Sequence, residues 1–175
     1  IGVYHDGGSI IPGLANALLQ TYNFPIAFVP AAKGGSNLHG QWSYRNSSRP
    51  DDTTNLYGYS ITKARRAGGV ELIIMHQGEA DVYDNRTKAQ YESDYARMVG
   101  NYRTDLYSTI PVFHCQLGVK KAYTDAAVVA IRSAQRDLDN GTSIFISSTA
   151  MDQPPHDAVH YDTPGLTVIG QRIAQ

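Results

Sequence analysis

Residues 72–79 read Leu-Ile-Ile-Met-His-Gln-Gly-Glu, four apolar side chains followed at once by a polar, glycine-containing segment. An apolar run without polar alternation is typical of a strand that is covered on both faces. Three other runs have the same character, and they are Ile26–Val29, Pro111–Cys115 and Ser143–Ile146. Ile1–Tyr4 is a weaker candidate. These runs predict a buried sheet.

Amphipathic segments separate the apolar runs. The clearest is Thr87–Tyr107, where apolar and aromatic side chains recur at helical spacing and Thr87 and Gln90 form a capping-box pattern. The other predicted helices are Pro12–Tyr22, Leu56–Ala67, Thr124–Leu138 and Thr163–Ile173. Alternation of helices and strands predicts an α/β fold with a parallel sheet. Ligands of such sheets bind beyond the carboxyl ends of the strands.

The composition limits the possible functions. The chain has 175 residues, enough for one domain with a core, and its net charge of −1 gives no electrostatic case for binding nucleic acid or an anionic membrane surface. No apolar run approaches the roughly 20 residues that span a bilayer. Cys115 is the only cysteine, so no internal disulfide forms. We expect His114 and Cys115 to pack in the core rather than act as ligand or nucleophile.

Two segments that follow predicted strands carry groups suited to stabilising an oxyanion. Gly34-Gly35 allows a sharp turn and leaves backbone N–H groups open to a ligand. Gln77 can aim its side-chain amide at a developing negative charge. Each has a plainer interpretation: an ordinary turn for the glycines, and for Gln77 a polar loop in which Glu79 and Asp81 are solvated.

The segment after the last predicted strand contains Asp157-Ala-Val-His160. An aspartate three residues before a histidine can accept the Nδ1 hydrogen and leave Nε2 as a general base. The alternatives are an ordinary surface pair and a metal site that adds His156. Pro154-Pro155 disfavours a helix that would present two histidines on one face, so we expect no metal.

Taken together and in this order, the three segments resemble the SGNH hydrolase superfamily, with closest similarity to the sialate O-acetylesterase-like carbohydrate esterases. The resemblance covers most of the chain. It implies a flavodoxin-like three-layer α/β/α sandwich with a central parallel sheet. It also implies that Gly35 and Gln77 form the oxyanion hole, that Glu79 supports the loop, and that Asp157 and His160 are the acid–base pair.

The family's nucleophilic serine lies in a Gly-x-Ser-Asn block after the first strand, and nothing before Ser9 matches that block. We therefore expect residues 1–175 to form a single esterase domain that is truncated at its N-terminus, with the nucleophile upstream of Ile1. Ser9 is a weak candidate, and helix capping is its plainer role. Ser36, in Gly34-Gly35-Ser36-Asn37, is the rival.

The resemblance implies removal of acetyl groups from sugar hydroxyls through a serine acyl-enzyme. It requires no cofactor, and the partner is an acetylated carbohydrate. Trp42 and Tyr44, in the polar segment between residues 34 and 54, are predicted to stack on the sugar, or else to pack that segment onto the domain. One alternative is a non-catalytic carbohydrate-binding or adhesion module of the same fold. Another is a lipolytic or peptide-acyl esterase, which the lack of an apolar pocket run disfavours. The sequence does not fix the oligomeric state.

Overall fold

The computed structural model describes residues 8–118, 125–147, 150, 152–153, 157 and 159–175. The elements in chain order are α1 (Ile10–Thr21), the irregular helical turn η1 (Leu38–Trp42), α2 (Leu56–Arg66), β1 (Ile73–His76), α3 (Glu79–Tyr83), α4 (Lys88–Asp105), β2 (Val112–Cys115), α5 (Asp125–Asp137), β3 (Ile144–Ser147) and α6 (Thr163–Ile173). The predicted strand Ile1–Tyr4 lies outside the described residues.

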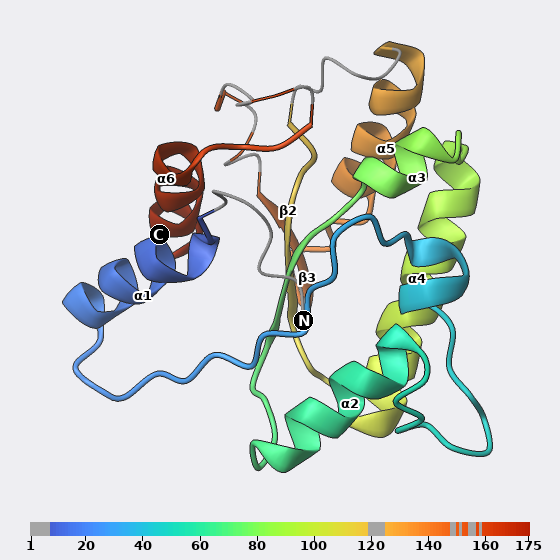
Figure 1. The fold of residues 1–175 in the computed structure, drawn as a ribbon, viewed down its shortest axis with the longest axis horizontal. Helices are drawn as coiled ribbons and strands as arrows, with labels where there is room; N and C mark the ends of the chain where they lie inside the picture. The colour runs from blue at the N-terminus through green and yellow to red at the C-terminus, as the bar shows by residue number, and fades with distance from the viewer. Residues whose placement is uncertain (1–7, 119–124, 148–149, 151, 154–156, 158) are drawn as a thin grey trace.

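The three strands form a parallel sheet in the order β1-β2-β3. The register pairs Met75 with His114 and His114 with Ile146, so neighbours across the sheet share a face. Helices α1 and α6 lie on one side of the sheet, and α3, α4 and α5 lie on the other (Figure 1). The predicted α/β fold with three layers is confirmed.

Local signals place the helix ends close to where the sequence predicts them. The capping box of α4 forms in full, because the Thr87 hydroxyl accepts from the Gln90 N–H and the Gln90 side chain accepts from the Thr87 N–H. At α6 the Asp162 carboxylate accepts from the Gly165 N–H at 2.8 Å, and proline occupies the first turn. Ser9 caps α1 by accepting from the Ile11 N–H.

The prediction of a strand at Ile26–Val29 is wrong. The segment belongs to no strand, and Ala27 is exposed. Strand β1 pairs only with β2 among the described residues, so no described strand offers Ile26–Val29 a ladder partner. An apolar run alone cannot supply the hydrogen bonds that define a strand.

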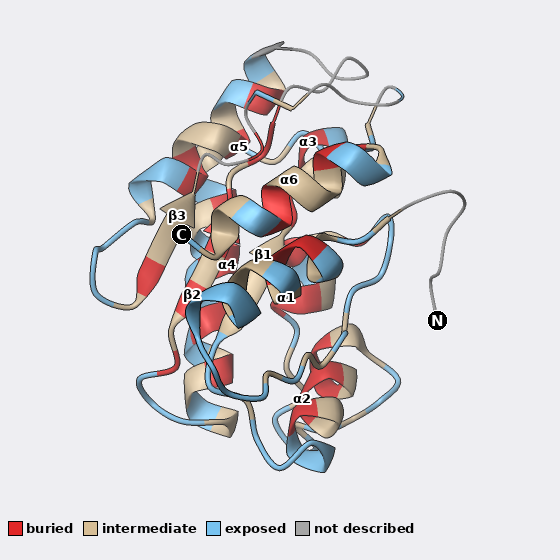
Figure 2. Ribbon diagram, turned by 90° about the vertical axis from the view of Figure 1, so that its left-hand side faces the viewer, coloured by how far each residue is buried: buried red, intermediate tan, exposed pale blue. Residues whose placement is uncertain are grey.

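Most of the core lies between the sheet and the α3–α4–α5 side and is rich in tyrosine. Tyr57, Tyr91 and Tyr95 are fully buried there, together with Met98 and Ile131. Buried positions lie along the strands and on one side of the helices (Figure 2). A second, smaller cluster joins the other face of the sheet to α6. The tyrosine hydroxyls therefore need partners inside the core, and several of these partners belong to the site described below.

Glycines allow α1 and α6 to approach closely. A Cβ atom at Gly170 would lie 2.1 Å from the Ile10 carbonyl oxygen, and one at Gly13 would lie 2.2 Å from the Thr167 carbonyl oxygen. Gly8, just before α1, likewise lies against Thr163 at the start of α6. The first turns of α1 therefore pack directly against the second half of α6.

Among the described helices, none combines the length and apolar character needed to cross a membrane.

Candidate active site

Tyr161 docks the segment that carries His160 onto the carboxyl ends of the strands. Its ring stacks on His76, the last residue of β1, with 5.7 Å between the ring centroids. Its hydroxyl donates to the carbonyl of Ala150, which follows β3, at 3.3 Å. The same hydroxyl packs against Gly118, which follows β2 and where a Cβ atom would lie only 2.0 Å away. One buried side chain therefore holds the residue after His160 to all three strand ends.

Asp157 and His160 form a hydrogen-bonded pair. The carboxylate Oδ2 lies 2.8 Å from Nδ1 of the imidazole, and Oδ1 accepts from the N–H groups of His160 and Val159, each at 2.6 Å. Hydrogen bonds from the backbone and the ring of His160, and then from Val159, lower the pKa of the Asp157 carboxyl well below its usual range. The His160 side chain is 77% exposed and the Asp157 side chain is 52% exposed. With its hydrogen on Nδ1, the imidazole keeps Nε2 as an acceptor.

Gly35 and Ser36 lie beside Gln77. The side-chain Nε2 of Gln77 donates to the Ser36 carbonyl at 3.3 Å, which joins the glycine turn to the end of β1. Gly35 has a φ of +66°, a conformation that favours glycine, and it is exposed. Its N–H donates no hydrogen bond within the described part of the chain. This N–H is therefore available to a ligand at the rim where Gln77 and Tyr161 also lie.

A buried polar network holds Gln77 in place. The Tyr91 hydroxyl donates to the side-chain Oε1 of Gln77 at 3.2 Å. The backbone carbonyl of Gln77 accepts from Gln135 Nε2 at 2.9 Å and lies 3.2 Å from His114 Nε2. Burial lowers the pKa of His114 to about 3, so the ring is neutral at ordinary pH. His114 is thus the core histidine that the sequence predicts.

The segment after Gln77 is not the solvated polar loop that was the plainer interpretation. Residues 79–83 form α3, and Asp81 is fully buried. Its carboxylate accepts from the Leu38 N–H, with distances of 3.0 and 3.2 Å to its two oxygens, and from Gln77 Nε2. Glu79, the first residue of α3, adds to the effect of burial in raising the pKa of Tyr161 to about 12. The supporting role of Glu79 stays a prediction.

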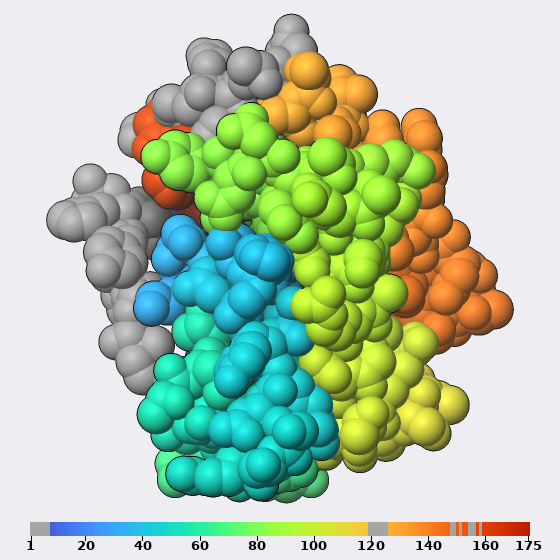
Figure 3. All heavy atoms as spheres, turned by 90° about the vertical axis from the view of Figure 1, so that its right-hand side faces the viewer, coloured from blue at the N-terminus to red at the C-terminus, as the bar shows by residue number. Residues whose placement is uncertain are grey.

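The polar segment 34–54 runs along α4 (Figure 3) and is anchored by two more carboxylates of that helix. Asp94 is buried, pairs with Arg86 and Arg97, and has His39 Nδ1 3.7 Å away. Asp105, at the end of α4, receives two hydrogen bonds of 2.7 Å from Arg45. Asp81, Asp94 and Asp105 therefore hold segment 34–54 from the carboxyl ends of the strands to the C-terminal end of α4.

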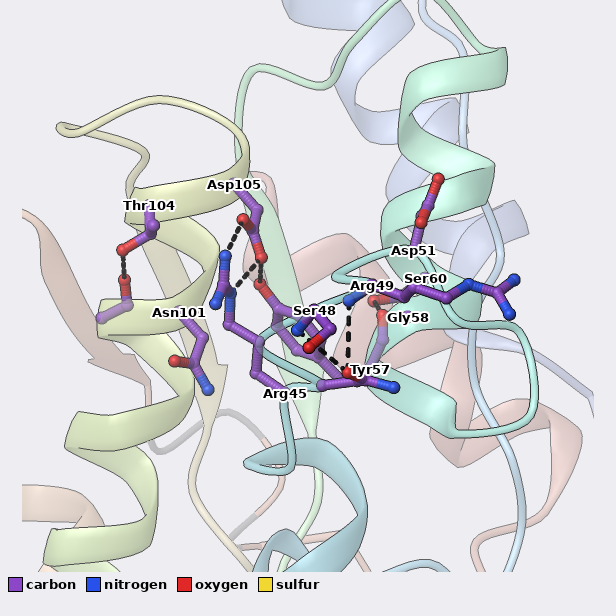
Figure 4. Close-up of polar contacts among 12 residues, drawn as sticks. Arg45, Ser48, Arg49, Asp51, Tyr57, Gly58, Ser60, Asn101, Thr104 and Asp105 are labelled. Atoms are coloured by element: carbon purple, nitrogen blue, oxygen red, sulfur yellow. Dashed lines mark hydrogen bonds and ion pairs between the residues drawn. The ribbon is translucent and has the colours of Figure 1, made fainter.

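Tyr57 completes the lower anchor, because its hydroxyl donates to Asp105 at 2.6 Å (Figure 4). The Arg45 guanidinium holds the pKa of the Asp105 carboxyl below its usual range, and burial together with the Asp105 contact raises the pKa of Tyr57. In the group formed by Arg45, Tyr57 and Asp105, the charges of Arg45 and Asp105 are paired. The group lies at the C-terminal end of α4, away from Gln77. Its role is to hold the chain.

The two predicted sugar-stacking residues lie in different surroundings. Trp42 is 8% exposed, belongs to the core, and donates from Nε1 to the Ser36 hydroxyl at 2.8 Å. Tyr44 is 51% exposed, but the neighbouring Ser43 carbonyl binds Asn101 near the end of α4, away from the rim. A substrate contact for either residue stays a prediction.

The serine candidates have other partners. The Ser36 hydroxyl donates to the Lys33 carbonyl at 2.6 Å and is 8% exposed, so its donor and one acceptor site are used. Ser9 caps α1, which confirms its plainer role. Neither serine hydroxyl is hydrogen-bonded to His160 in the described part of the chain.

The predicted absence of a metal can be examined only in part, because His156 lies outside the described residues. Among those that are described, no three His, Cys, Asp or Glu side chains come together in a group suited to a metal ion.

Comparison with known proteins identifies the family. Residues 9–175 match the model of the carbohydrate esterases described as sialic acid-specific acetylesterase. The chain belongs to this family. The match includes all the site segments described above. No curated protein sequence is similar enough to count as a relative.

Solved structures share the fold of this family member. A protein from Arabidopsis thaliana is 23% identical with a TM-score of 0.71, and the alignment covers 93% of this chain and 64% of that one. A carbohydrate acetylesterase from Xanthomonas citri is 21% identical with a TM-score of 0.70, over 94% and 39% of the two chains. A carbohydrate esterase of family 3 from Talaromyces cellulolyticus is 16% identical with a TM-score of 0.50, over 65% and 59%. The chain thus spans less than two thirds of the length of each of these neighbours.

Sequence reasoning missed three residues of this candidate site. Tyr161 and Asp81 dock the two loops, and Gln135 holds the carbonyl of Gln77. Tyr161 directly follows the Asp157–His160 motif, so its position was the available signal. Gln135 was visible as a polar residue on the apolar stripe of a predicted helix. Asp81 gave no signal, because nothing in the sequence distinguishes a buried carboxylate from a solvated one.

Proposed function

We propose that this protein removes acetyl groups from sugar hydroxyls by way of a serine acyl-enzyme. The observation that carries the proposal is the Asp157–His160 pair, with 2.8 Å between carboxylate and imidazole, docked at the strand ends where Gly35 and Gln77 also lie. A carboxylate behind a histidine and donors for an oxyanion are the parts that acyl transfer needs beside a nucleophile. Membership of a carbohydrate esterase family supports the substrate class.

In the proposed reaction, His160 takes the proton of the serine through Nε2 as the hydroxyl attacks the acetyl carbonyl. Asp157 fixes the tautomer and stabilises the charged imidazolium. The Gly35 N–H and an amide hydrogen of Gln77 stabilise the oxyanion, which typically contributes about 3–4 kcal/mol to barrier lowering for each donor. His160 then returns the proton to the departing sugar hydroxyl, and water releases acetate by the same steps.

We place the nucleophilic serine upstream of Ile1, since residues 1–7 contain no serine, in a segment that would follow a strand added to the free edge of β1. Among the described residues β1 pairs on one side only, and the parallel register brings the end of any strand added there to the same rim as Gln77. Ser9 and Ser36 are both engaged elsewhere, which supports a third serine.

A fluorophosphonate label on the intact protein, followed by mass spectrometry of its peptides, identifies the nucleophile. We expect the label on a serine upstream of Ile1, and unchanged labelling in the Ser9→Ala and Ser36→Ala variants. A label on either of those serines would overturn this assignment. Failure to label at all, together with binding of acetylated sugar, would favour the non-catalytic module.

Hydrolysis of an aryl acetate and of acetylated sugars tests the acid–base pair. We expect Asp157→Asn to lower kcat by about 10⁴-fold, because the imidazole loses the partner that fixes its tautomer. Asp152→Asn is the matched control: Asp152 is an exposed carboxylate of the same segment, but it pairs with Arg172 at 2.5 and 3.0 Å. Equal rates for the parent and the Asp157→Asn variant would remove the basis of the proposal.

A further inference from the structure

Asp81 joins the two halves of the oxyanion site. It lies in α3, is fully buried, and forms no ion pair with the described residues. Its carboxylate accepts from the backbone N–H groups of Leu38 and His39, and from Gln77 Nε2. Leu38 lies three residues after Gly35. One buried carboxylate therefore holds both the glycine turn and the amide at the end of β1.

The chemistry of these contacts requires an acceptor. The groups that hydrogen-bond to Asp81 are all N–H donors, and an ionised carboxylate accepts at both oxygens and donates nothing. An asparagine of the same shape would turn an NH₂ group toward one of these donors. Burial raises the pKa of Asp81, while the hydrogen bonds from Leu38 and Gln77 oppose the rise. The site keeps a carboxylate here in spite of the unfavourable burial of its charge.

The contacts also orient the Gln77 amide. The Tyr91 hydroxyl donates to Oε1 at 3.2 Å, so the nitrogen faces Asp81 and Ser36. One Nε2 hydrogen is bound by the carboxylate of Asp81, and the other is held only by the 3.3 Å contact to the Ser36 carbonyl. That contact is at the long end of hydrogen-bond distances. An oxyanion, which is a stronger acceptor than a neutral carbonyl, can take this second hydrogen.

We propose that Asp81 is a positioning residue that fixes one hydrogen of the Gln77 amide and the Leu38 N–H, and so holds the other Gln77 hydrogen and the Gly35 N–H at the spacing that an oxyanion needs. This inference rests on the proposed esterase function. Asp81 acts only through Gln77 and the glycine turn and does not touch the substrate. Its effect therefore falls on the step in which the oxyanion forms.

The test compares Asp81→Asn with Asp105→Asn in the intact enzyme, with active sites counted by fluorophosphonate titration. Both variants remove a buried carboxylate that anchors segment 34–54, but Asp105 binds Arg45 and Tyr57 at the far end of α4. We expect Asp81→Asn to lower kcat about 10²-fold with KM changed less than two-fold, because small misplacements of donors affect the transition state most. Asp105→Asn lowers the resistance to urea and leaves kcat per active site unchanged.

A double-mutant cycle with Gln77→Ala separates positioning from general support. If Asp81 acts through Gln77, most of its effect on kcat disappears in the Gln77→Ala background. Fully additive effects, an unchanged kcat, or equal losses in the Asp81 and Asp105 variants would overturn the inference while leaving the esterase function intact. Absence of turnover in the parent would overturn the esterase function and this inference together. Should Asp81→Asn not fold, Asp81→Ser, which admits water to the same N–H groups, is measured in its place with the same expected loss.

Discussion

Replacing His114 by phenylalanine should make the protein less sensitive to acid. His114 is 1% exposed, and burial lowers its pKa from the ordinary 6.5 to about 3. In the unfolded chain the imidazole takes up a proton below pH 6.5, whereas the folded protein does not until about pH 3. Unfolding therefore binds a proton in this window, and the free energy of unfolding falls as the pH is lowered. The stabilising contribution is complete above pH 6.5 and is lost progressively below it.

The magnitude follows from the size of the shift. Each pH unit well below 6.5 removes about 1.4 kcal/mol from the free energy of unfolding, so the parent should lose about 2–3 kcal/mol between pH 6.5 and pH 4.5 through this one group. Urea unfolding followed by circular dichroism at half-unit steps measures the slope. Phenylalanine fills the ring volume and cannot titrate, so the His114→Phe slope should be shallower by that amount.

A control separates titration from loss of packing. Ile110 is fully buried in the same core, and Ile110→Val should lower the free energy of unfolding by about 1 kcal/mol at every pH without changing the slope. Parallel curves for the parent and the His114→Phe variant between pH 6.5 and 4.5 would refute the reasoning, because they would show that a different group controls acid sensitivity.

Two further predictions concern packing. Gly170→Ala should lower the free energy of unfolding by about 3 kcal/mol, because the new methyl group would lie 2.1 Å from the Ile10 carbonyl oxygen, whereas Gly100→Ala in the open interior of α4 should raise it by about 0.5–1 kcal/mol. Thermal melts in which both variants shift in the same direction would contradict the helix contact. Tyr57→Phe should cost about 2 kcal/mol, the usual range for a hydrogen bond to a charged group, since its hydroxyl binds Asp105 at 2.6 Å. Urea midpoints that are equal with and without the hydroxyl would exclude that contribution.

The helices and the strands that pair were predictable because their signals are local. The capping box at Thr87 and the proline in the first turn of α6 fix helix starts without reference to the rest of the chain. The apolar run at Ile26–Val29 shows that a local pattern alone does not predict a strand. A strand exists only if another strand supplies its hydrogen bonds, and that depends on which segments lie next to each other in space. The five-residue helix α3 was missed because it is short and its sequence is polar.

The motifs of the candidate site were predictable from the sequence. The buried residues that hold these motifs in place were not. The pairing of Asp157 with His160 was predictable from their spacing of three residues, which the structure confirms as a contact of 2.8 Å. The burial of Asp81 depends on Leu38, which lies 43 positions away along the chain. Long-range partners of this kind decide whether a polar residue is solvated or buried, and a single sequence does not contain them.

The two sides of the site are built under different physical conditions. The Gln77 side is buried, and the Gln77 amide, the Gln77 carbonyl and Asp81 are hydrogen-bonded to buried partners. Substitutions there should therefore affect both folding and chemistry. The Asp157–His160 pair is more than half exposed, and exposed pairs contribute little to folding stability. The fold therefore does not depend on that pair, and what holds it at the rim is the buried ring of Tyr161 next to it. Substitutions at Asp157 and His160 should therefore lower activity without lowering stability. Tyr161→Ala removes the docking contact and a buried ring, so it should lower activity and stability together.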